Sequence, residues 1–368
     1  MMKPSALHAI LLAILIMASS VCCTPARPEQ VFSIRKGVNI GNWLSQSSVR
    51  GEERDRAFNE TFVRDIASYG FDHIRLPVDE EQLFDENGEF DMETLGLVHR
   101  TIKQCEASGL KVLFDLHIIR SHNFDSAGNQ LWTSLEEQDR LLGLWHKIDE
   151  QLCGYSPDLV AYEFLNEPVA PDTEQWNQLF NRFIRQIREH DKERVLVIES
   201  NRWGGTRHVR EMSVPEEDPN IIIEMHFYEP YLLTHYQAGW SKFAGLDFSM
   251  PMQYPGKLMS AELYDALSDE EKTIVKDYYA DYSKETILDS WQSAIDFAAS
   301  KGLRLYLGEF GCLPECGRTN RMNWMSDVVG LCRENGIPYC YWEYNRIFGF
   351  ADTYGNVTDQ ELLEILTK

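Results

Sequence analysis

The segment Tyr162-Glu163-Phe164-Leu165-Asn166-Glu167-Pro168 decides the fold of this chain. Its apolar, β-rich run predicts a buried strand, and the proline ends that strand. The segment Leu305-Tyr306-Leu307-Gly308-Glu309-Phe310-Gly311 has the same form, with glycine as the breaker. Each segment therefore places a glutamate, Glu167 or Glu309, at the C-terminal end of a buried strand.

Similar runs recur along the whole chain. Eight of them predict strands, at Lys36–Ile40, His73–Pro77, Lys111–His117, Val160–Leu165, Arg194–Ser200, Ile221–Phe227, Leu303–Glu309 and Pro338–Glu343. Amphipathic helical patterns lie between them, at Asn59–Tyr69, Asp91–Ser108, Leu135–Gln151, Thr173–His190, Thr286–Ser300 and Arg321–Asn335. Strand and helix alternating eight times predict a single (β/α)₈ TIM barrel of the α/β class. An open doubly wound sheet is the alternative, and it is disfavoured because no glycine-rich phosphate turn follows the first strand.

One connection is longer than the others. Residues Glu229–Lys284, between the sixth and seventh predicted strands, are rich in Tyr, Met and Pro. We expect an elaborated loop on the catalytic face, with a helix of its own around Ser268–Tyr282. A structural cover over the outer ring of helices is the alternative.

Composition limits the classes of partner. The chain has 368 residues and a formal net charge of −23, which argues against nucleic acid and against an anionic membrane surface. A neutral polymer such as a polysaccharide is compatible with this charge. We expect a monomer with no obligate protein partner.

The N-terminus has the pattern of an export signal. Lys3 precedes the apolar run Ile10–Met17, which is too short to span a bilayer, and small residues follow it. We therefore divide the chain into a signal peptide with the start of a linker at 1–24 and one catalytic domain at 25–368. The expected location is secreted, periplasmic or at the cell surface, and Cys22 or Cys23 leaves lipid anchoring open as an alternative.

Six further cysteines lie in the predicted domain. They are Cys105, Cys153, Cys312, Cys316, Cys332 and Cys340. An even number permits disulfides in an exported protein, but the spacing does not choose between pairings. No second ligand pair follows Cys312 and Cys316 at the spacing of a structural zinc site.

Polar and aromatic residues end six of the eight predicted strands. In a barrel of this kind the active site lies at the C-terminal ends of the strands, so these side chains are expected to converge. They are Arg75, His117, Asn166 with Glu167, His226 with Tyr228, Glu309 and Trp342. Two carboxylates across one pocket suit glycosidic bond cleavage, in which one protonates the leaving oxygen and the other attacks or activates water.

These residues, with the opening segment Arg35-Lys36-Gly37-Val38-Asn39-Ile40-Gly41-Asn42-Trp43-Leu44, resemble glycoside hydrolase family 5, the cellulase-like retaining glycosidases. The resemblance runs from about Lys36 to Trp342. It implies that Glu167 is the general acid/base and Glu309 the nucleophile, with no metal or cofactor. It also implies substrate-binding or supporting roles for Arg75, His117, Asn166, His226, Tyr228 and Trp342.

The expected chemistry of the pair follows from its neighbours. A nucleophilic carboxylate must stay ionised, and Arg75 and Tyr228 supply a cation and a hydroxyl beside Glu309. The acid needs a raised pKa, and we expect a neighbouring negative charge to raise it. Glu163, Asp115 and Glu343 lie near the predicted site and fit either supporting or purely structural roles. Trp203 and Trp132 fit either sugar-stacking platforms or core.

We therefore expect a secreted retaining endo-glycosidase that hydrolyses a β-linked glucan, with β-1,4-glucan as the first choice. β-1,3-Glucan, β-mannan and exo-action are alternatives, because the family covers several β-linked glycans. Two other classes stay open. One is a metal-dependent barrel with His117, Glu167, His226 and Glu309 as ligands, and the other is a non-catalytic sugar-binding barrel.

Overall fold

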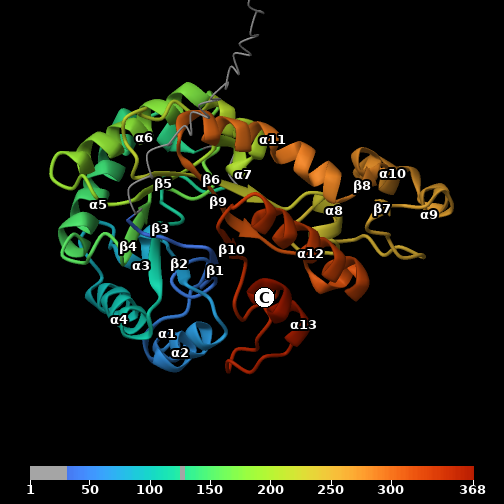
Figure 1. Cartoon of the computed structure of the whole chain (residues 1–368), viewed down its shortest axis with the longest axis horizontal. Coiled ribbons are helices and arrows are strands. Elements are labelled where there is room, and N and C mark those ends of the chain that lie inside the picture. The colour runs from blue at the N-terminus through green and yellow to red at the C-terminus, as the bar shows by residue number, and fades with distance from the viewer. Residues whose placement is uncertain (1–30, 125–128) are drawn as a thin grey trace, which may run out of the picture. The chain divides into compact units, whose positions relative to one another are not determined.

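Eight parallel strands close into a barrel at the centre of the chain (Figure 1). The strand order around the barrel is β1-β10-β9-β6-β5-β4-β3-β2. The strands are β1 (Lys36–Asn39), β2 (His73–Val78), β3 (Lys111–Leu116), β4 (Val160–Glu163), β5 (Leu196–Glu199), β6 (Ile221–Phe227), β9 (Arg304–Phe310) and β10 (Tyr339–Tyr341). All eight correspond to predicted strands, and the predicted barrel is confirmed.

This computed structural model describes residues 31–124 and 129–368. The predicted export signal, its linker and the lipid-anchoring alternative at Cys22 or Cys23 lie outside the described residues and stay predictions. Within the described ranges, none of the helices combines the length and apolarity needed to cross a bilayer.

Helices cover the outside of the barrel (Figure 1). The longer ones are α2 (Glu60–Ser68), α4 (Met92–Ser108), α5 (Leu135–Leu152), α6 (Thr173–Arg188), α11 (Lys284–Lys301), α12 (Arg318–Glu334) and α13 (Gln360–Thr367). Shorter ones are α1 (Gly51–Ala57), α3 (Glu80–Leu83) and α7 (Asn201–Gly204), with 3₁₀ turns η1 (Gln130–Trp132), η2 (Thr206–Glu211) and η4 (Pro314–Cys316).

The expected alternation was wrong between β5 and β6. No long helix forms in this connection, where α7 and η2 stand in its place. The physical reason is the sequence itself, since Gly204 and Gly205 interrupt it and Arg202 and Trp203 adopt left-handed backbone angles.

Local signals set the helix ends. The side chain of Asp91 caps α4 by accepting from the backbone N–H of Thr94, and Ser134 caps α5 in the same way through Glu137. At the other end of α4, Gly109 has φ 75°, a left-handed conformation that glycine adopts without steric cost.

The long connection after β6 forms a small subdomain of its own. It contains α8 (Tyr231–Thr234), α9 (Ala261–Ala266), α10 (Asp269–Val275), η3 (Lys276–Tyr278) and the antiparallel pair β7 (Gly256–Lys257) and β8 (Asp281–Tyr282). The helix expected around Ser268–Tyr282 is thus α10 followed by η3. Its first part packs at the barrel mouth, where Ala238 clusters with Trp342, and Tyr254 farther along donates to Asp327 of α12. Both alternatives hold in part, because the connection reaches the mouth and also covers α12.

The barrel interior changes from apolar to polar along the strands. Leu113, Ala161, Val197 and Ile222 fill its lower part as one buried cluster. Two residues farther along each strand the side chain points the same way, because side chains alternate across a strand. Those positions are Asp115, Glu163, Glu199 and Glu224, and all four are buried.

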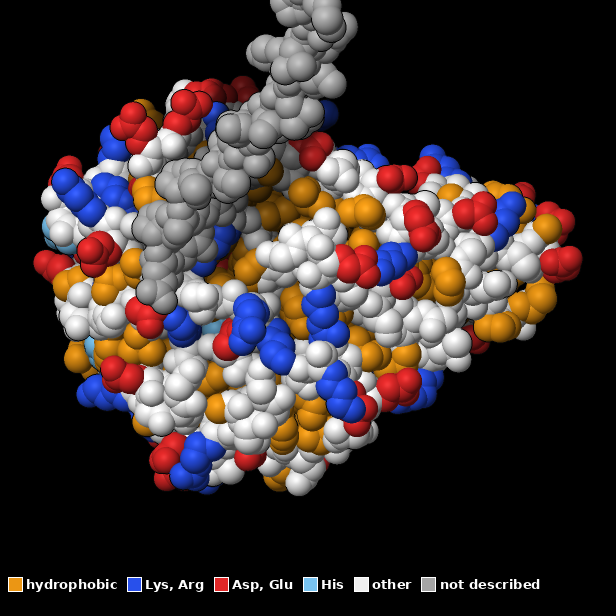
Figure 2. Space-filling model, viewed as in Figure 1, with side chains coloured by type: hydrophobic (Ala, Val, Ile, Leu, Met, Phe, Trp, Pro, Cys, Tyr) orange, Lys and Arg blue, Asp and Glu red, His pale blue; other side chains and the backbone are white. Residues whose placement is uncertain are grey.

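The outer surface mixes both signs of charge. Figure 2 shows acidic and basic side chains interspersed over the visible part of one face. The six cysteines of the described chain are free thiols. Sγ of Cys312 lies 3.4 Å from Sγ of Cys316, as close neighbours just after β9.

Candidate active site

Glu309 is held by a cation and a hydroxyl at the end of β9. Nη1 of Arg75 donates to its Oε1 at 2.5 Å, and the hydroxyl of Tyr228 donates to its Oε2 at 2.9 Å. The carboxyl group is buried, with 5% of the residue exposed. Both groups therefore donate hydrogen bonds to this carboxyl group, as the family resemblance implied.

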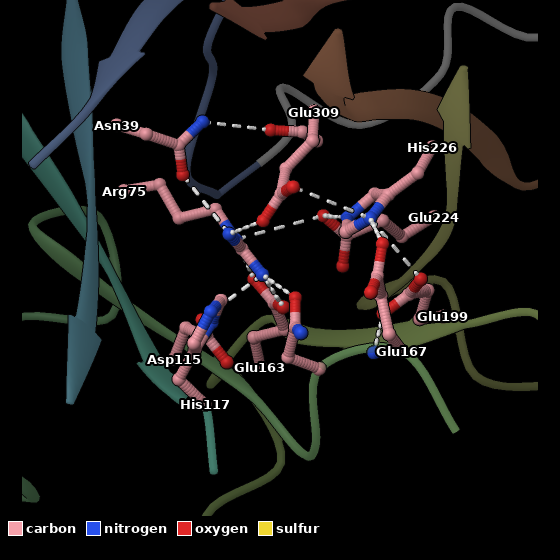
Figure 3. A network of polar contacts seen from close by, with 12 residues as sticks. Asn39, Arg75, Asp115, His117, Glu163, Glu167, Glu199, Glu224, His226 and Glu309 are labelled. Atoms are coloured by element: carbon pink, nitrogen blue, oxygen red, sulfur yellow. Dashed lines mark hydrogen bonds and ion pairs between the residues drawn. The ribbon is translucent and has the colours of Figure 1, made fainter. Parts of the chain in front are cut away.

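Arg75 organises the floor of the site (Figure 3). Its Nε and Nη2 donate to the two carboxylate oxygens of Glu163, at 2.7 and 2.5 Å. Nη2 also donates to Oδ1 of Asn166 at 2.8 Å and lies 2.9 Å from Oδ2 of Asp115. This fully buried guanidinium therefore links four strands, and the surrounding carboxylates keep its pKa well above the ordinary value against the effect of burial.

Glu167 lies across from Glu309, with His226 between them. Nδ1 of His226 is 3.1 Å from Oε1 of Glu167 and 3.7 Å from Oε2 of Glu309. One oxygen of each carboxylate and a ring nitrogen of His226 all lie within 4.8 Å of one another. The backbone of Glu167 has φ 46°, an uncommon left-handed conformation for a residue with a side chain.

Burial raises the pKa of Glu167 to about 7. The electrostatic effects of His117 and Arg75 act in the opposite direction. We had expected a neighbouring negative charge to be the cause, and this expectation was wrong: the loss of water around a side chain packed above the barrel dominates. A carboxyl group with such a pKa still carries its proton in about half of the molecules at neutral pH, and in more of them below it, and can donate it.

Trp342 and His117 form one wall of the mouth. Their rings stack with centroids 5.7 Å apart and planes 7° from parallel. Nδ1 of His117 contacts Oδ2 of Asp115 at 2.7 Å, and Gln46 lies 3.0 Å from Nε2. The amide of Gln46 donates to Nε2, so Nδ1 carries the proton and donates to the carboxylate.

Comparison with known proteins agrees with this geometry. The model of the cellulase family, glycosyl hydrolase family 5, matches residues 36–346.

The chain belongs to glycosyl hydrolase family 5.

This glycoside hydrolase is 29% identical over 341 residues to endoglucanase C of Acetivibrio thermocellus, covering 91% of this chain and 98% of the relative. It is 27% identical to cellodextrinase A of Ruminococcus flavefaciens, covering 91% and 94%. Among solved structures, it is similar to Cel5A of Thermotoga maritima with cellobiose, with a TM-score of 0.73, 23% identity, and 90% and 97% of the two chains covered. This structural likeness shows the same barrel fold.

The structure of this family 5 hydrolase brings all eight predicted site residues to one mouth. Arg75, Asn166, His226 and Tyr228 contact Glu167, Glu309 or one another directly, and His117 and Trp342 form the wall. Their roles in catalysis and sugar binding stay predictions.

Sequence reasoning missed several residues of the site. Asn39 accepts from Arg75 and donates to the carbonyl of Gly308, while Glu199 accepts the backbone N–H of Glu167. Glu224 lies 3.7 Å from Nε2 of His226. A signal for the two glutamates was present, because each is an acid at an inward position that ends or interrupts an otherwise apolar strand, as in Ile221-Ile222-Ile223-Glu224.

Glu343 ends the site on the β10 side. Its Oε2 accepts from Nδ2 of Asn42 at 2.8 Å, and burial raises its pKa to about 7. Gly41 makes room for it, because a Cβ there would lie 2.5 Å from the same oxygen. Glu343, which follows Trp342 in the sequence, is therefore a buried acid held by a hydrogen bond at the edge of the site.

Trp203 and Trp132, which fitted either sugar platforms or core, differ clearly in their exposure to solvent. Trp203 is 50% exposed, and its Nε1 donates to the carbonyl of Phe124 at 2.7 Å. Trp132 is buried and packs edge-on against His122 and Trp176. Trp132 is therefore core, and only Trp203 offers an open ring.

Two groups of described residues have the donor atoms and proximity for a metal ion. They are Glu167, His226 and Glu309, and Glu199, Glu224 and His226. In the first group Oε1 of Glu309 already accepts from Arg75 and Oε2 from Tyr228. A guanidinium at this distance opposes a second cation, which disfavours the metal-dependent alternative.

Proposed function

We propose that this protein is an endo-β-1,4-glucanase that works by double displacement with retention of configuration. The observation that carries the proposal is the convergence of Glu167 and Glu309, with oxygens within 4.8 Å across one mouth. Carboxyl groups in retaining glycosidases lie about 5–5.5 Å apart, whereas inverting enzymes need more room for a water molecule.

In the first step Glu309 is the nucleophile and Glu167 the acid. An oxygen of Glu309 forms a bond to the anomeric carbon while the bond to the leaving oxygen breaks. The protonated carboxyl of Glu167 gives its proton to that oxygen, so the shortened chain leaves as an alcohol. Arg75 and Tyr228 each donate a hydrogen bond to Glu309 and hold its carboxyl group in position for the attack.

In the second step the same two groups reverse their parts. Glu167, now a carboxylate, takes a proton from water as the water oxygen attacks the anomeric carbon. The bond to Glu309 breaks, and both carboxyl groups return to their starting protonation states. We propose that Asn166 binds the sugar 2-hydroxyl through its amide N–H, because Arg75 donates to its Oδ1 and thereby holds the amide.

The choice of β-1,4-glucan is supported by the relatives. Endoglucanase C is similar over nearly the full length of both chains, and the cellodextrinase is similar to a comparable extent. The stacked pair Trp342 and His117 offers a flat wall suited to a sugar ring. We also propose that residues 1–24 direct export and that the protein acts as a monomer.

Product analysis on a panel of substrates tests the proposal. The purified protein is incubated with β-1,4-glucan, β-1,3-glucan, β-mannan and xylan, and the products are analysed by mass and linkage. We expect internal cleavage of β-1,4-glucan, with a β-configured product at first release. Preferred cleavage of another polymer would replace the substrate, and an α-configured first product would overturn the retaining mechanism.

Replacement of the proposed nucleophile provides the internal control. Glu309→Ala should show no turnover, because it removes the carboxylate that forms the covalent intermediate. Glu52→Gln, at a side chain 92% exposed on α1, should keep wild-type activity. Measurable hydrolysis by folded Glu309→Ala would overturn the assignment of Glu309.

A further inference from the structure

Glu199 and Glu224 lie beneath the proposed catalytic pair, in space that two glycines leave open (Figure 3). Both carboxyl groups are fully buried. A Cβ on Gly308 would lie 1.6 Å from Oε1 of Glu224, and one on Gly204 would lie 2.3 Å from Oε1 of Glu199. The backbone is thus shaped around these two acids.

The network holds more carboxyl groups than its cation can balance. Its acids are Asp115, Glu163, Glu167, Glu199, Glu224 and Glu309, connected through Arg75 and His226. Arg75 gives its short contacts to Glu163 and Glu309. A further ionised carboxylate buried without a partner is strongly unfavourable, so some of these groups must carry protons.

Glu224 and His226 each have an unsatisfied atom facing the other. Among the described residues, the two carboxyl oxygens of Glu224 have no hydrogen-bond partner, and Nε2 of His226 has none either. Oε1 of Glu224 lies 3.7 Å from Nε2, and Nε of Arg75, 3.9 Å away, donates to Glu163 instead. A proton on Glu224 would give both atoms a partner once this 3.7 Å separation shortens to hydrogen-bond distance.

The other ring nitrogen of His226 must carry the ring proton. Nδ1 faces Oε1 of Glu167 at 3.1 Å, Oε1 of Glu199 at 3.4 Å and Oε2 of Glu309 at 3.7 Å. Nδ1 thus faces three carboxyl groups, whereas Nε2 faces only Glu224, and this surrounding favours the ring proton on Nδ1. In the neutral imidazole, Nε2 is then the acceptor, which needs a donor on the side of Glu224.

We propose that Glu224 is a neutral carboxylic acid that donates to Nε2 of His226 and thereby fixes the tautomer in which Nδ1–H points at Glu167. Glu224 is a positioning residue, because it acts on the proposed acid through the imidazole. The proposal deepens the proposed function and rests on it for the catalytic consequence only.

The groups that face Glu224 support its neutral form. They are Arg75 on β2, Asp115 on β3, Glu163 on β4, Glu199 on β5, His226 on β6 and Glu309 on β9. Burial raises the pKa of Glu224 well above its ordinary value, the nearby carboxyl groups add to the effect, and Arg75 opposes it. Burial also lowers the pKa of His226 to about 4, which keeps the ring neutral.

The consequence for catalysis has a definite sign. Donation from Nδ1–H favours the carboxylate of Glu167, which forms when the leaving oxygen takes its proton. Without Glu224 the ring is free to carry its proton on Nε2, and Nδ1 then accepts from protonated Glu167. That change would raise the pKa of Glu167 and weaken it as an acid.

Two variants and one spectroscopic assignment test the proposal. Nitrogen-15 NMR of the histidine rings, with the His226 signals assigned by their loss in His226→Asn, should show Nδ1–H in the wild type. Glu224→Gln should keep this tautomer, because its amide N–H can donate to Nε2. Glu224→Met, similar in size but with no donor, should lose it, lower kcat about tenfold with little change in KM, and move the alkaline limb of the pH profile up by about one unit.

Infrared spectroscopy decides the protonation state without turnover. At pH 8 the wild type should show the C=O stretch of a protonated carboxyl group, and Glu224→Gln should reduce it. The matched control Glu80→Gln removes an equally buried glutamate that ion-pairs with Arg120 and Arg140, and it should leave this band unchanged.

Several outcomes would overturn the proposal. They are an Nε2–H tautomer in the wild type, an infrared band that Glu224→Gln does not reduce, or a stoichiometric metal ion bound by Glu199, Glu224 and His226 in the purified protein. If Glu224→Met does not fold, the wild-type tautomer and the Glu224→Gln band still decide. Because neither spectrum requires substrate, both measurements still test the protonation of Glu224 and His226 if the proposed function is wrong.

Discussion

The two carboxyl groups across the mouth differ in what surrounds them. Glu309 receives short hydrogen bonds from a guanidinium and a phenol, whereas Glu167 contacts a neutral imidazole and is raised in pKa mainly by burial. Two acids of the same kind thus lie in different surroundings, which suits the proposed division into a nucleophile and an acid.

The raised pKa of Glu167 predicts the alkaline limb of the pH profile. Glu167 must be protonated in the first step, so kcat/KM should fall as the pH rises through about 7. Glu167→Gln should lower kcat/KM about 10²–10⁴-fold for a poor leaving group and remove that limb. Initial rates from pH 5 to 9 check this, and wild-type activity still rising above pH 8 would contradict it.

At the scale of elements, the inward positions of neighbouring strands determine the site. Gly308 of β9 has no side chain, and the carboxyl group of Glu224 from β6 occupies the place where its Cβ would lie. Asn39 of β1 in turn binds the carbonyl of Gly308. A small residue on one strand therefore admits a large polar one from the next.

Gly308→Ala tests this packing. The added methyl group would overlap Glu224 and force it to move, so we expect the free energy of unfolding to fall by about 1–3 kcal/mol, together with a loss of activity. The matched control is Gly96→Ala on α4, where a Cβ meets nothing within 4 Å; it should raise the stability by roughly 0.5–1 kcal/mol. Urea unfolding of both variants measures the difference, and equal stabilities would contradict the packing argument.

For the whole molecule, buried titratable groups connect catalysis with stability. Burial raises the pKa of Glu167, Asp115 and Glu343 to about 7 each. In the unfolded chain these acids lose their protons near their ordinary values, so above those values the native state binds more protons and stability falls as the pH rises. Buried histidines such as His226, with a pKa lowered to about 4, act in the opposite direction, but only below about pH 6.5.

Above pH 6.5 the buried acids, joined near pH 9 by buried thiols such as Cys332, hold protons that the unfolded chain loses, so Tm should decrease from pH 6.5 to pH 9. The decrease should be shallower in Glu224→Gln, because glutamine has no proton to lose on unfolding. Thermal unfolding at fixed ionic strength across this range measures both slopes. A Tm that rises over this interval in the wild type would contradict the assignment of buried, proton-holding acids.

The sequence by itself determined the barrel and the position of the proposed catalytic pair. Apolar β-rich runs ending at Pro168 or Gly311 are local patterns, and the C-terminal ends of parallel strands must meet at one mouth once the barrel closes. For the same reason Arg75, His226 and Tyr228 could be placed beside Glu167 and Glu309. The absence of a long helix between β5 and β6 was harder to predict from the sequence, because it depends on left-handed backbone angles at Arg202 and Trp203.

Only the tertiary structure decided which buried groups face one another. The sequence shows Glu199 and Glu224 only as acids within apolar strands. Closure of the barrel sets them beside His226, in the space left by Gly204 and Gly308. Burial, which raises the pKa of Glu167, is likewise a property of the packed fold and not of its neighbours in sequence. The physical reason is that local patterns set strands and their ends, whereas desolvation and close contact arise between segments far apart in the chain.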